Sequence, residues 1–217
     1  MKLLMRFSAL FFLMVITLSV YGYFYWLTAK SISGKESYHS SVGKKDDHIT
    51  NLRLKQKGLS LLQFANENNF NTTRCFLADM KIFSGNKRLF VYNLQKDSIE
   101  MAGLVAHGSG SDTGGDELFF SNTPNSNCTS LGKYKIGKSY MGKFGLAYKL
   151  VGLDNTNNKA FERFVVLHAH PCVPNENIGP VALCESWGCP TVSPDFLNEL
   201  KIIISRSDKP IILWIYN

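Results

Sequence analysis

An alternating segment at residues 144–153, "FGLAYKLVGL", restricts the fold of this chain more than any other feature. Large apolar side chains alternate in it with smaller or polar ones. Because successive side chains of a strand point to opposite faces of a sheet, the pattern predicts a half-buried strand, with residues 132–137 as its partner. Residues 87–94 and 99–108 flank the polar turn of residues 95–98, so they predict a β-hairpin.

Shorter signals predict the remaining elements. "RFVVLHAH" (163–170) is typical of a buried strand, and "KPIILWIYN" (209–217) predicts a last strand. Ser193, Pro194 and Asp195 provide an N-cap, a first-turn proline and an acid that suits the helix dipole, so a helix of about ten residues is expected to begin there. No strand-helix-strand rhythm is present, which favours a mainly β, mainly antiparallel architecture with a few short helices.

Residues 51–71 are expected to form an N-terminal helical segment that packs on the domain, which follows over residues 72–217. Gly58 weakens the helical pattern. The apolar positions at roughly helical spacing are Leu52, Leu59, Leu62 and Ala65. Inside the domain, the Gly/Ser/Asn/Asp-rich segment 108–130 is predicted to be a functional loop, with a disordered insertion as the alternative.

The N-terminus carries a pattern that indicates export. Lys2 and Arg6 precede an almost uncharged run at residues 7–29. A cleavable signal peptide has an apolar stretch of about 7 to 15 residues, whereas a membrane-spanning helix needs about 20. The length favours a signal anchor over a signal peptide for residues 1–29, with membrane contact through this segment and the rest of the chain outside the cytoplasm. Residues 30–50 are polar and are expected to form a tether.

Composition and charge narrow the possible partners. With 45% hydrophobic and 19% charged residues, the chain has the composition of a folded protein. Its 217 residues suit one ordinary domain with accessory segments. The net charge is +7, but Lys and Arg are scattered singly, whereas a nucleic-acid-binding surface clusters its charge. We therefore expect no nucleic-acid partner; no oligomeric state is predicted.

Five cysteines in an exported chain allow two bridges and one thiol, or one bridge and three thiols. The sequence leaves the pairing open, but an odd count requires an unpaired thiol unless chains are cross-linked or a cysteine is lipidated. Two of the five lie in "CESWGCP" (184–190), where Cys189 is a candidate disulfide half, metal ligand or nucleophile.

Zinc binding is the weaker of the two chemical interpretations. Thiolate and imidazole are the preferred ligands of a zinc ion, but the spacing of the candidate residues matches no common zinc-binding motif. The residues that could take part are His168, His170, Cys172, Cys184 and Cys189. We therefore expect no metal site.

A nucleophilic cysteine needs a base within reach and donors for the oxyanion. Gly188 permits a tight backbone path, so that amide N–H groups near Cys189 can face an incoming carbonyl. His168 is a candidate base, although a histidine at a strand end is also a common core or rim residue.

The sequence resembles the L,D-transpeptidase catalytic domain family, in its YkuD-like branch. The resemblance covers about residues 72–217 and rests on an ordered set of motifs: "RLFVYNL", "LVAHG", "FFSNTPNS", "SLGKYKIGKSYMGKFGLAYKLVGL", "VVLHAH" and "SWGCP". It implies a β-sandwich-like catalytic domain whose cysteine attacks peptidoglycan stem peptides between residues three and four. The acyl-enzyme would release D-alanine and then pass to an amine or to water. No metal or organic cofactor is required.

The resemblance also assigns roles to residues. Cys189 would be the nucleophile and His168 the base, with Ser186 and Gly188 in the catalytic loop and Ser186 helping to hold the histidine. The positions that would bind substrate are His107, Gly108, Trp187 and Ser130. The cell envelope, periplasmic or extracytoplasmic, is the expected location.

The chain departs from the family pattern at two positions. Ala169 stands where a glycine is common, and Glu185 where an arginine is common. These differences keep open the alternative of a catalytically impaired peptidoglycan-binding module of the same fold. If water is the acceptor, the alternative is an L,D-carboxypeptidase or other hydrolase of wall peptides. Cys172 and Cys184 are additional cysteines near the motif, and we hypothesise that they pair and leave Cys189 free.

Overall fold

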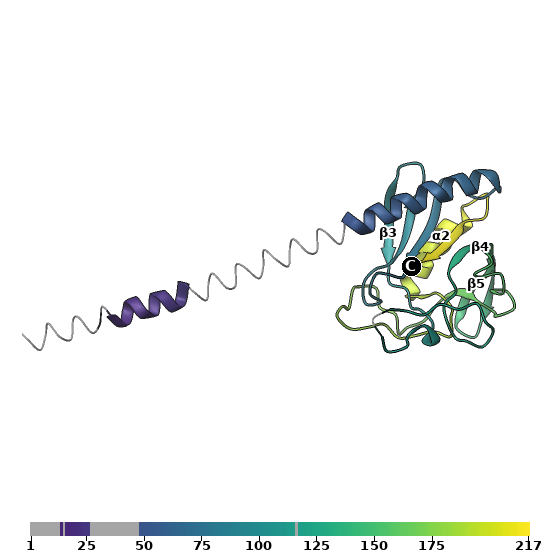
Figure 1. Cartoon of the computed structure of the whole chain (residues 1–217). Coiled ribbons are helices and arrows are strands. Elements are labelled where there is room, and N and C mark those ends of the chain that lie inside the picture. The colour runs from purple at the N-terminus through teal and green to yellow at the C-terminus, as the bar shows by residue number, and fades with distance from the viewer. Residues whose placement is uncertain (1–13, 15, 27–47, 116) are drawn as a thin grey trace, which may run out of the picture. The chain divides into compact units, whose positions relative to one another are not determined.

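The computed structural model describes residues 14, 16–26, 48–115 and 117–217 (Figure 1). The chain divides into two units, residues 1–53 and 54–217. In the first unit, residues 16–26 are helical. Among the described residues, no helix has both the length and the apolar character needed to cross a membrane.

Most of the predicted N-terminal segments cannot be compared with the structure. The larger part of the signal anchor predicted for residues 1–29, and of the tether predicted for residues 30–50, lies outside the described residues. The last part of that tether is helical, because a helix covers residues 48–67. This helix is the N-terminal helical segment predicted for residues 51–71.

The second unit is mainly β, as predicted. Its strands and remaining helices are β1 (Arg74–Asp79), β2 (Leu89–Asn93), β3 (Ser98–Gly103), the 3-10 helix η1 (Ser109–Ser111), β4 (Gly132–Gly142), β5 (Gly145–Gly152), β6 (Val166–Ala169), β7 (Thr191–Val192), α2 (Pro194–Ser205) and β8 (Ile212–Tyr216). The two predicted hairpins are the antiparallel pairs β2–β3 and β4–β5, and the predicted last strand is β8.

One sheet contains all of these strands, in the order β3-β2-β1-β8-β4-β5-β6-β7. Neighbours are antiparallel except for β1 with β8 and β6 with β7. The C-terminal strand β8 thus joins the two halves of the sheet. The main core takes Val91 from β2 and Leu167 from β6, on opposite sides of this junction, so the sheet curves around that core. This curvature accounts for the predicted sandwich-like character.

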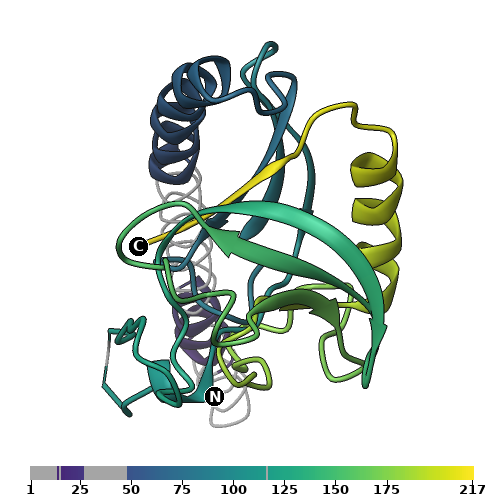
Figure 2. The ribbon, with the colours of Figure 1, turned by 90° about the vertical axis from the view of Figure 1, so that its right-hand side faces the viewer.

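Two helices cover the β1–β2 part of the sheet from opposite sides (Figure 2). Alternation in β1 sends Phe76 toward the main core, which includes α2, and Leu77 toward a second cluster. The helix of residues 48–67 contributes Leu54, Leu61 and Ala65 to that second cluster. The predicted apolar face was therefore wrong in part, because Leu52 and Leu59 are exposed.

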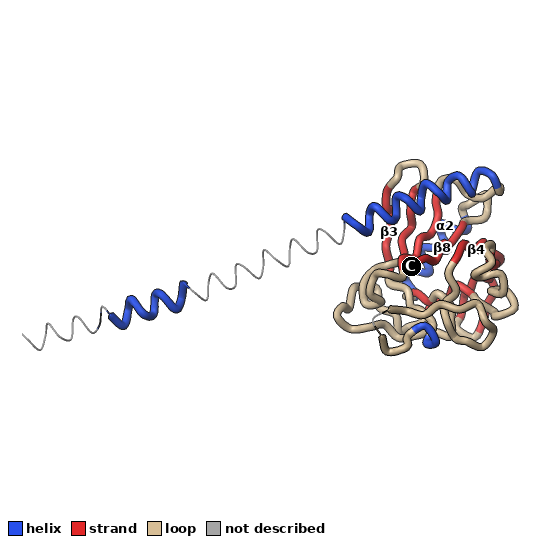
Figure 3. The backbone as a smooth tube through the Cα atoms, viewed as in Figure 1, coloured by secondary structure: helices blue, strands red, loops and turns tan. Residues whose placement is uncertain are grey.

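Local chemistry explains how both helices are placed. A side chain at Gly58 would come within 2.7 Å of the Tyr92 ring, so glycine lets this helix lie close to β2. At α2, the Ser193 side chain accepts a hydrogen bond from the Phe196 N–H, and Pro194 opens the first turn, as predicted. Figure 3 shows long loops gathered at one end of this unit, together with η1.

Candidate active site

Cys189 lies in a small, largely apolar pocket of about 190 Å³. Its walls come from the β6–β7 edge, the 184–189 loop and the start of β5. The lining residues are Ala106, Phe144, His168, His170, Cys172, Cys184, Glu185, Ser186, Trp187, Cys189 and Thr191. The structure thus brings Cys189, His168, Ser186 and Trp187 of the predicted site to one cavity.

The Cys189 thiol is half-buried and contacts the backbone at the start of β6 and just before it. Its Sγ accepts a hydrogen bond from the Val166 N–H at 3.5 Å and lies 3.9 Å from the Phe164 carbonyl oxygen, to which it can donate. Burial raises the pKa of the thiol, while the Val166 N–H and the nearby Arg163 charge act in the opposite direction. The thiol is therefore protonated at neutral pH in the absence of a base.

His168 faces the same pocket from β6, stacked on Phe144 with 5.5 Å between ring centroids. Its Nε2 lies 2.9 Å from Thr191 Oγ1, and its Nδ1 lies 3.1 Å from the Ala169 carbonyl oxygen. Burial lowers the pKa of His168, so the imidazole is neutral at pH 7. Within the described part of the chain, no hydrogen bond joins His168 to the Cys189 thiol.

Ser186 organises the turn before the cysteine. Its Oγ donates to the Cys189 carbonyl oxygen at 2.6 Å and accepts from the Gly188 N–H at 3.1 Å. The expectation that Ser186 helps to hold the histidine was wrong, because its hydroxyl contacts only the backbone, whereas Thr191 contacts the imidazole. The amide N–H groups of Trp187 and Cys189 make no hydrogen bond with any described residue, so both are available to an oxyanion.

Gly188 is required by its backbone conformation and by its surroundings. Its φ angle is +104°, a region that disfavours side chains. A Cβ atom there would also lie 2.7 Å from the Cys128 carbonyl oxygen. Gly108 packs against the same glycine, since a Cβ on Gly108 would lie 2.7 Å from the Gly188 Cα. The two glycines therefore let the 184–189 loop lie directly on the 107–108 segment, where Gly108 and Ser186 form a β-bridge.

The other three predicted substrate-binding residues occupy different environments. Trp187 is 80% exposed at the pocket. Ser130 is 1% exposed and hydrogen-bonds to Tyr134 and Arg163, so its side chain is not open to a ligand. His107 is also buried, and its ring lies in a neighbouring cavity, because alternation in this segment turns Ala106 toward Cys189 and His107 away.

The family model for the L,D-transpeptidase catalytic domain matches residues 46–216, which include every residue of this pocket. The chain belongs to the L,D-transpeptidase catalytic domain family. No curated protein matches the chain at a significant level.

Solved structures of L,D-transpeptidases and related proteins show limited similarity. The helical cell shape determining protein Pgp2 (K307A mutant) from Campylobacter jejuni is 12% identical, with 67% of this chain and 47% of that chain covered and a TM-score of 0.45. The Ldtfm–avibactam carbamoyl enzyme is 11% identical, with coverages of 67% and 49% and a TM-score of 0.41. An L,D-transpeptidase from Mycobacterium smegmatis is 12% identical, with coverages of 67% and 59% and a TM-score of 0.40. This chain spans about half the length of the first two.

A disulfide joins Cys172 and Cys184 in this L,D-transpeptidase domain, as hypothesised, while Cys75, Cys128 and Cys189 are free thiols. The bridge removes Cys172 and Cys184 as thiolate ligands, which rules out the five-residue zinc set considered from the sequence. It also fixes the segment that leads into the 184–189 loop.

Two residues of the site were not predicted. In the sequence, nothing marks Thr191 as a site residue except its position two residues after Cys189. The Arg163 side chain donates hydrogen bonds to the Ser121 and Cys128 carbonyl oxygens at 2.9 and 2.6 Å. The same Cys128 carbonyl faces Gly188, so Arg163 supports the surface on which the cysteine turn rests.

Proposed function

We propose that the chain is an exported cysteine L,D-transpeptidase that remodels or cross-links peptidoglycan through an acyl-enzyme on Cys189. The observation that carries the proposal is that Cys189 and His168 line one pocket, beside a turn in which the Trp187 and Cys189 amide N–H groups have no hydrogen-bond partner among the described residues. Membership of the L,D-transpeptidase catalytic domain family supports a peptidoglycan-related function. The substrate is a stem peptide cleaved between its third and fourth residues.

The contacts of His168 suggest which ring nitrogen acts as the base. Nδ1 faces the Ala169 carbonyl oxygen, which can only accept, so the neutral ring carries its hydrogen on Nδ1. Nε2 is then the acceptor, and the Thr191 hydroxyl beside it can donate either to Nε2 or to the Cys189 carbonyl oxygen at 3.3 Å. Nε2 takes the thiol proton, and the Ala169 carbonyl oxygen stabilises the imidazolium that forms.

Acylation then proceeds in balanced steps. The Cys189 thiol gives its proton to His168, the thiolate forms a C–S bond with the carbonyl carbon, and the Trp187 and Cys189 N–H groups stabilise the oxyanion. The peptide C–N bond breaks, and D-alanine leaves with the proton from His168. An acceptor amine then attacks the thioester, gives its proton to His168 and forms an amide, while the thiolate leaves and is reprotonated.

A catalytically impaired peptidoglycan-binding module is the second candidate function. It is favoured by the hydrogen bonds of the two side chains, because in the described structure His168 contacts Thr191 and Ala169 and makes no hydrogen bond with the Cys189 thiol. Catalytic hydrogen bonds are often long before substrate binds, so we prefer the enzyme. Glu185 at the pocket wall adds negative charge where the family pattern has an arginine.

The proposed location is the cell envelope. Residues 1–29 would anchor the chain in the membrane or direct its secretion, and residues 30–50 would tether the domain near the wall. This proposal rests on the charge and length pattern of the N-terminal residues.

Product analysis with a tetrapeptide stem tests the proposed reaction. In the presence of an amine acceptor, we expect D-alanine release together with a new amide product, and Cys189→Ala should abolish both. D-alanine release that does not depend on the acceptor would indicate a carboxypeptidase. Binding to peptidoglycan without any release would favour the impaired module.

A further inference from the structure

In the sheet that the structure describes, the end of the β4–β5 hairpin has no third strand beside it. β8 pairs with β4 at residues 132–135, and β6 pairs with β5 at residues 147–149. Beyond these pairs, residues 141–146 pair only with each other. Residues 140–146 thus form a two-stranded ribbon at the end of the sheet, the hairpin tip.

The hairpin tip exposes apolar side chains on both of its faces. Met141 is 77% exposed, and Tyr140 and Phe144 are exposed as well. Because successive residues of a strand point to opposite faces, Tyr140 and Met141 present their apolar surfaces in opposite directions. Contiguous exposed apolar surface of this kind marks an interaction site.

The turn that precedes β6 extends this surface. Lys149 connects the two, because its Nζ lies 5.9 Å from the centroid of the Tyr140 ring and 5.2 Å from that of the Phe161 ring. Phe164, in the same turn, is 84% exposed and has a φ of +55°. That conformation is disfavoured for a bulky side chain, and the ring gains no burial in return, so the fold alone does not explain this residue.

The charges on this surface are mainly positive. Residues 138–149 contain three lysines and no acidic residue. The Lys143 ammonium lies 5.5 Å from the centroid of the Phe144 ring, and it forms no ion pair with any described acid. Glu162 is an exposed acid in the turn before β6. The hairpin tip therefore combines exposed apolar groups with ammonium groups.

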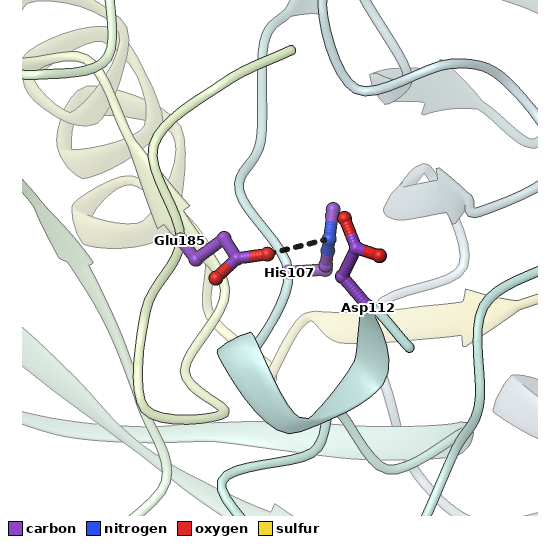
Figure 4. A group of neighbouring side chains, drawn as sticks. All are labelled: His107, Asp112 and Glu185. Carbon is purple, nitrogen blue, oxygen red and sulfur yellow. Dashed lines mark ion pairs between the residues drawn. The ribbon is translucent and has the colours of Figure 1, made fainter. Parts of the chain in front are cut away.

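The acid at the wall of the Cys189 pocket has other neighbours. The Glu185 carboxylate points toward His107, with 3.8 Å between Oε1 and Nε2, and Asp112 lies beside them (Figure 4). These three residues line the neighbouring cavity. Glu185 is therefore not paired with the lysines of the hairpin tip.

The surface of an anionic bilayer is the partner that matches these features. A flat partner would cover one face of the tip, whereas the interfacial layer of a bilayer surrounds an inserted ribbon and takes up apolar side chains from both faces. Aromatic rings and lysine stems lie at the boundary with the acyl chains, while the ammonium groups reach the headgroups. The lack of acids in residues 138–149 suits the negative potential of such a surface.

We propose that the hairpin tip, with Phe161 and Phe164, docks on the surface of an anionic phospholipid bilayer. This docking does not depend on the proposed reaction. Phe144 also lines the Cys189 pocket and stacks on His168, so docking places the mouth of the pocket at the bilayer surface. A peptide bound there in the docked state lies next to the membrane.

Amide hydrogen exchange of the full chain on vesicles tests the docking. One set of vesicles contains phosphatidylcholine alone, and the other contains an equimolar mixture of phosphatidylcholine and phosphatidylglycerol. The N-terminal residues are the same in both samples, so any anchoring through them contributes equally. We expect exchange in residues 140–146 to be at least about fivefold slower on the anionic vesicles. Exchange in β8 should be the same on both, which shows that the fold is intact.

The double variant Met141→Ser/Lys143→Ser should remove most of this difference, because it takes apolar surface and charge from the tip. Lys201→Ser/Ile202→Ser is the matched control. It makes the same kind of substitution at an exposed lysine and an exposed apolar residue of α2, and it should keep the full difference.

Equal exchange on the two kinds of vesicle in the wild type would overturn the docking, and so would a full difference in Met141→Ser/Lys143→Ser. Slower exchange caused by peptidoglycan fragments without lipid would overturn it in favour of a wall polymer as the partner. Slower exchange that increases with protein concentration on neutral vesicles would overturn it in favour of a second copy of the chain.

Discussion

Thr191 is the side chain that contacts His168, the proposed base, through a hydrogen bond. Its hydroxyl contacts His168 Nε2 and can bond to the Cys189 carbonyl oxygen, so it can serve either protonation state of the ring. Thr191→Val keeps the shape of the side chain and removes this partner. We expect the rate of Cys189 acylation to fall about tenfold, in line with roughly 1 to 1.5 kcal/mol for one hydrogen bond, and Thr191→Ser to restore most of it. Equal rates in the wild type and Thr191→Val would contradict this positioning role.

A substitution at Gly188 tests the conformation of the turn that precedes Cys189. Gly188→Ala combines an unfavourable φ of +104° with a Cβ atom 2.7 Å from the Cys128 carbonyl oxygen. Gly145→Ala is the matched control, because Gly145 has a φ of +84° but nothing within 4 Å of its Cβ position. We expect Gly145→Ala to lower the free energy of unfolding by about 1 to 2 kcal/mol and Gly188→Ala to lower it further. Urea unfolding measures both, and equal losses would show that the contact with Cys128 is unimportant.

Among the elements, the segment between β6 and the cysteine turn is held by the Cys172–Cys184 disulfide. A bridge that closes a loop of this size contributes about 3 kcal/mol by restricting the unfolded chain. The double variant Cys172→Ser/Cys184→Ser should therefore unfold at a lower urea concentration than the wild type. Reductant should lower the stability of the wild type toward that of the variant. A variant that unfolds at the same urea concentration would contradict this role.

Elements with a local periodic pattern could be predicted from the sequence, and those defined by distant partners could not. The β4–β5 hairpin is visible in the alternation of residues 144–153, and α2 in its Ser-Pro-Asp start. In contrast, β7 has two residues, too few for a period, and exists because it pairs with β6. That pairing sets Thr191 opposite His168, so this part of the site could not be read from the sequence.

The candidate site likewise contains residues that the sequence indicated and residues whose surroundings depend on distant parts of the chain. The residue types made Cys189 and His168 candidates, and the resemblance to the family supplied their expected roles. Ser130 was assigned to substrate binding, but Tyr134 and Arg163 enclose it from other parts of the chain. The position of His107 in a different cavity follows from strand alternation, a signal that the sequence did contain.

For the whole molecule, buried neutral histidines link stability to pH. The pKa values of His107 and His168 are lowered from 6.5, in both cases mainly by burial. The unfolded chain therefore binds more protons below pH 6.5, so stability is complete above that pH and is lost as the pH falls toward 4. We expect the free energy of unfolding to drop by roughly 2 kcal/mol between pH 7 and pH 4.5, with a smaller drop in His107→Gln. Urea unfolding at several pH values measures this, and a flat profile over the range would contradict it.

The curved sheet brings Cys189, His168 and the 184–189 loop together at one pocket, and we propose that a covalent acyl-enzyme forms there on Cys189. Intact-protein mass after incubation with a tetrapeptide stem tests this claim most directly. We predict an adduct equal to the stem without its terminal D-alanine, mapped to Cys189 by peptide analysis and absent from Cys189→Ala. An unchanged mass in correctly folded wild-type protein, or an adduct on Cys75 or Cys128, would contradict the account.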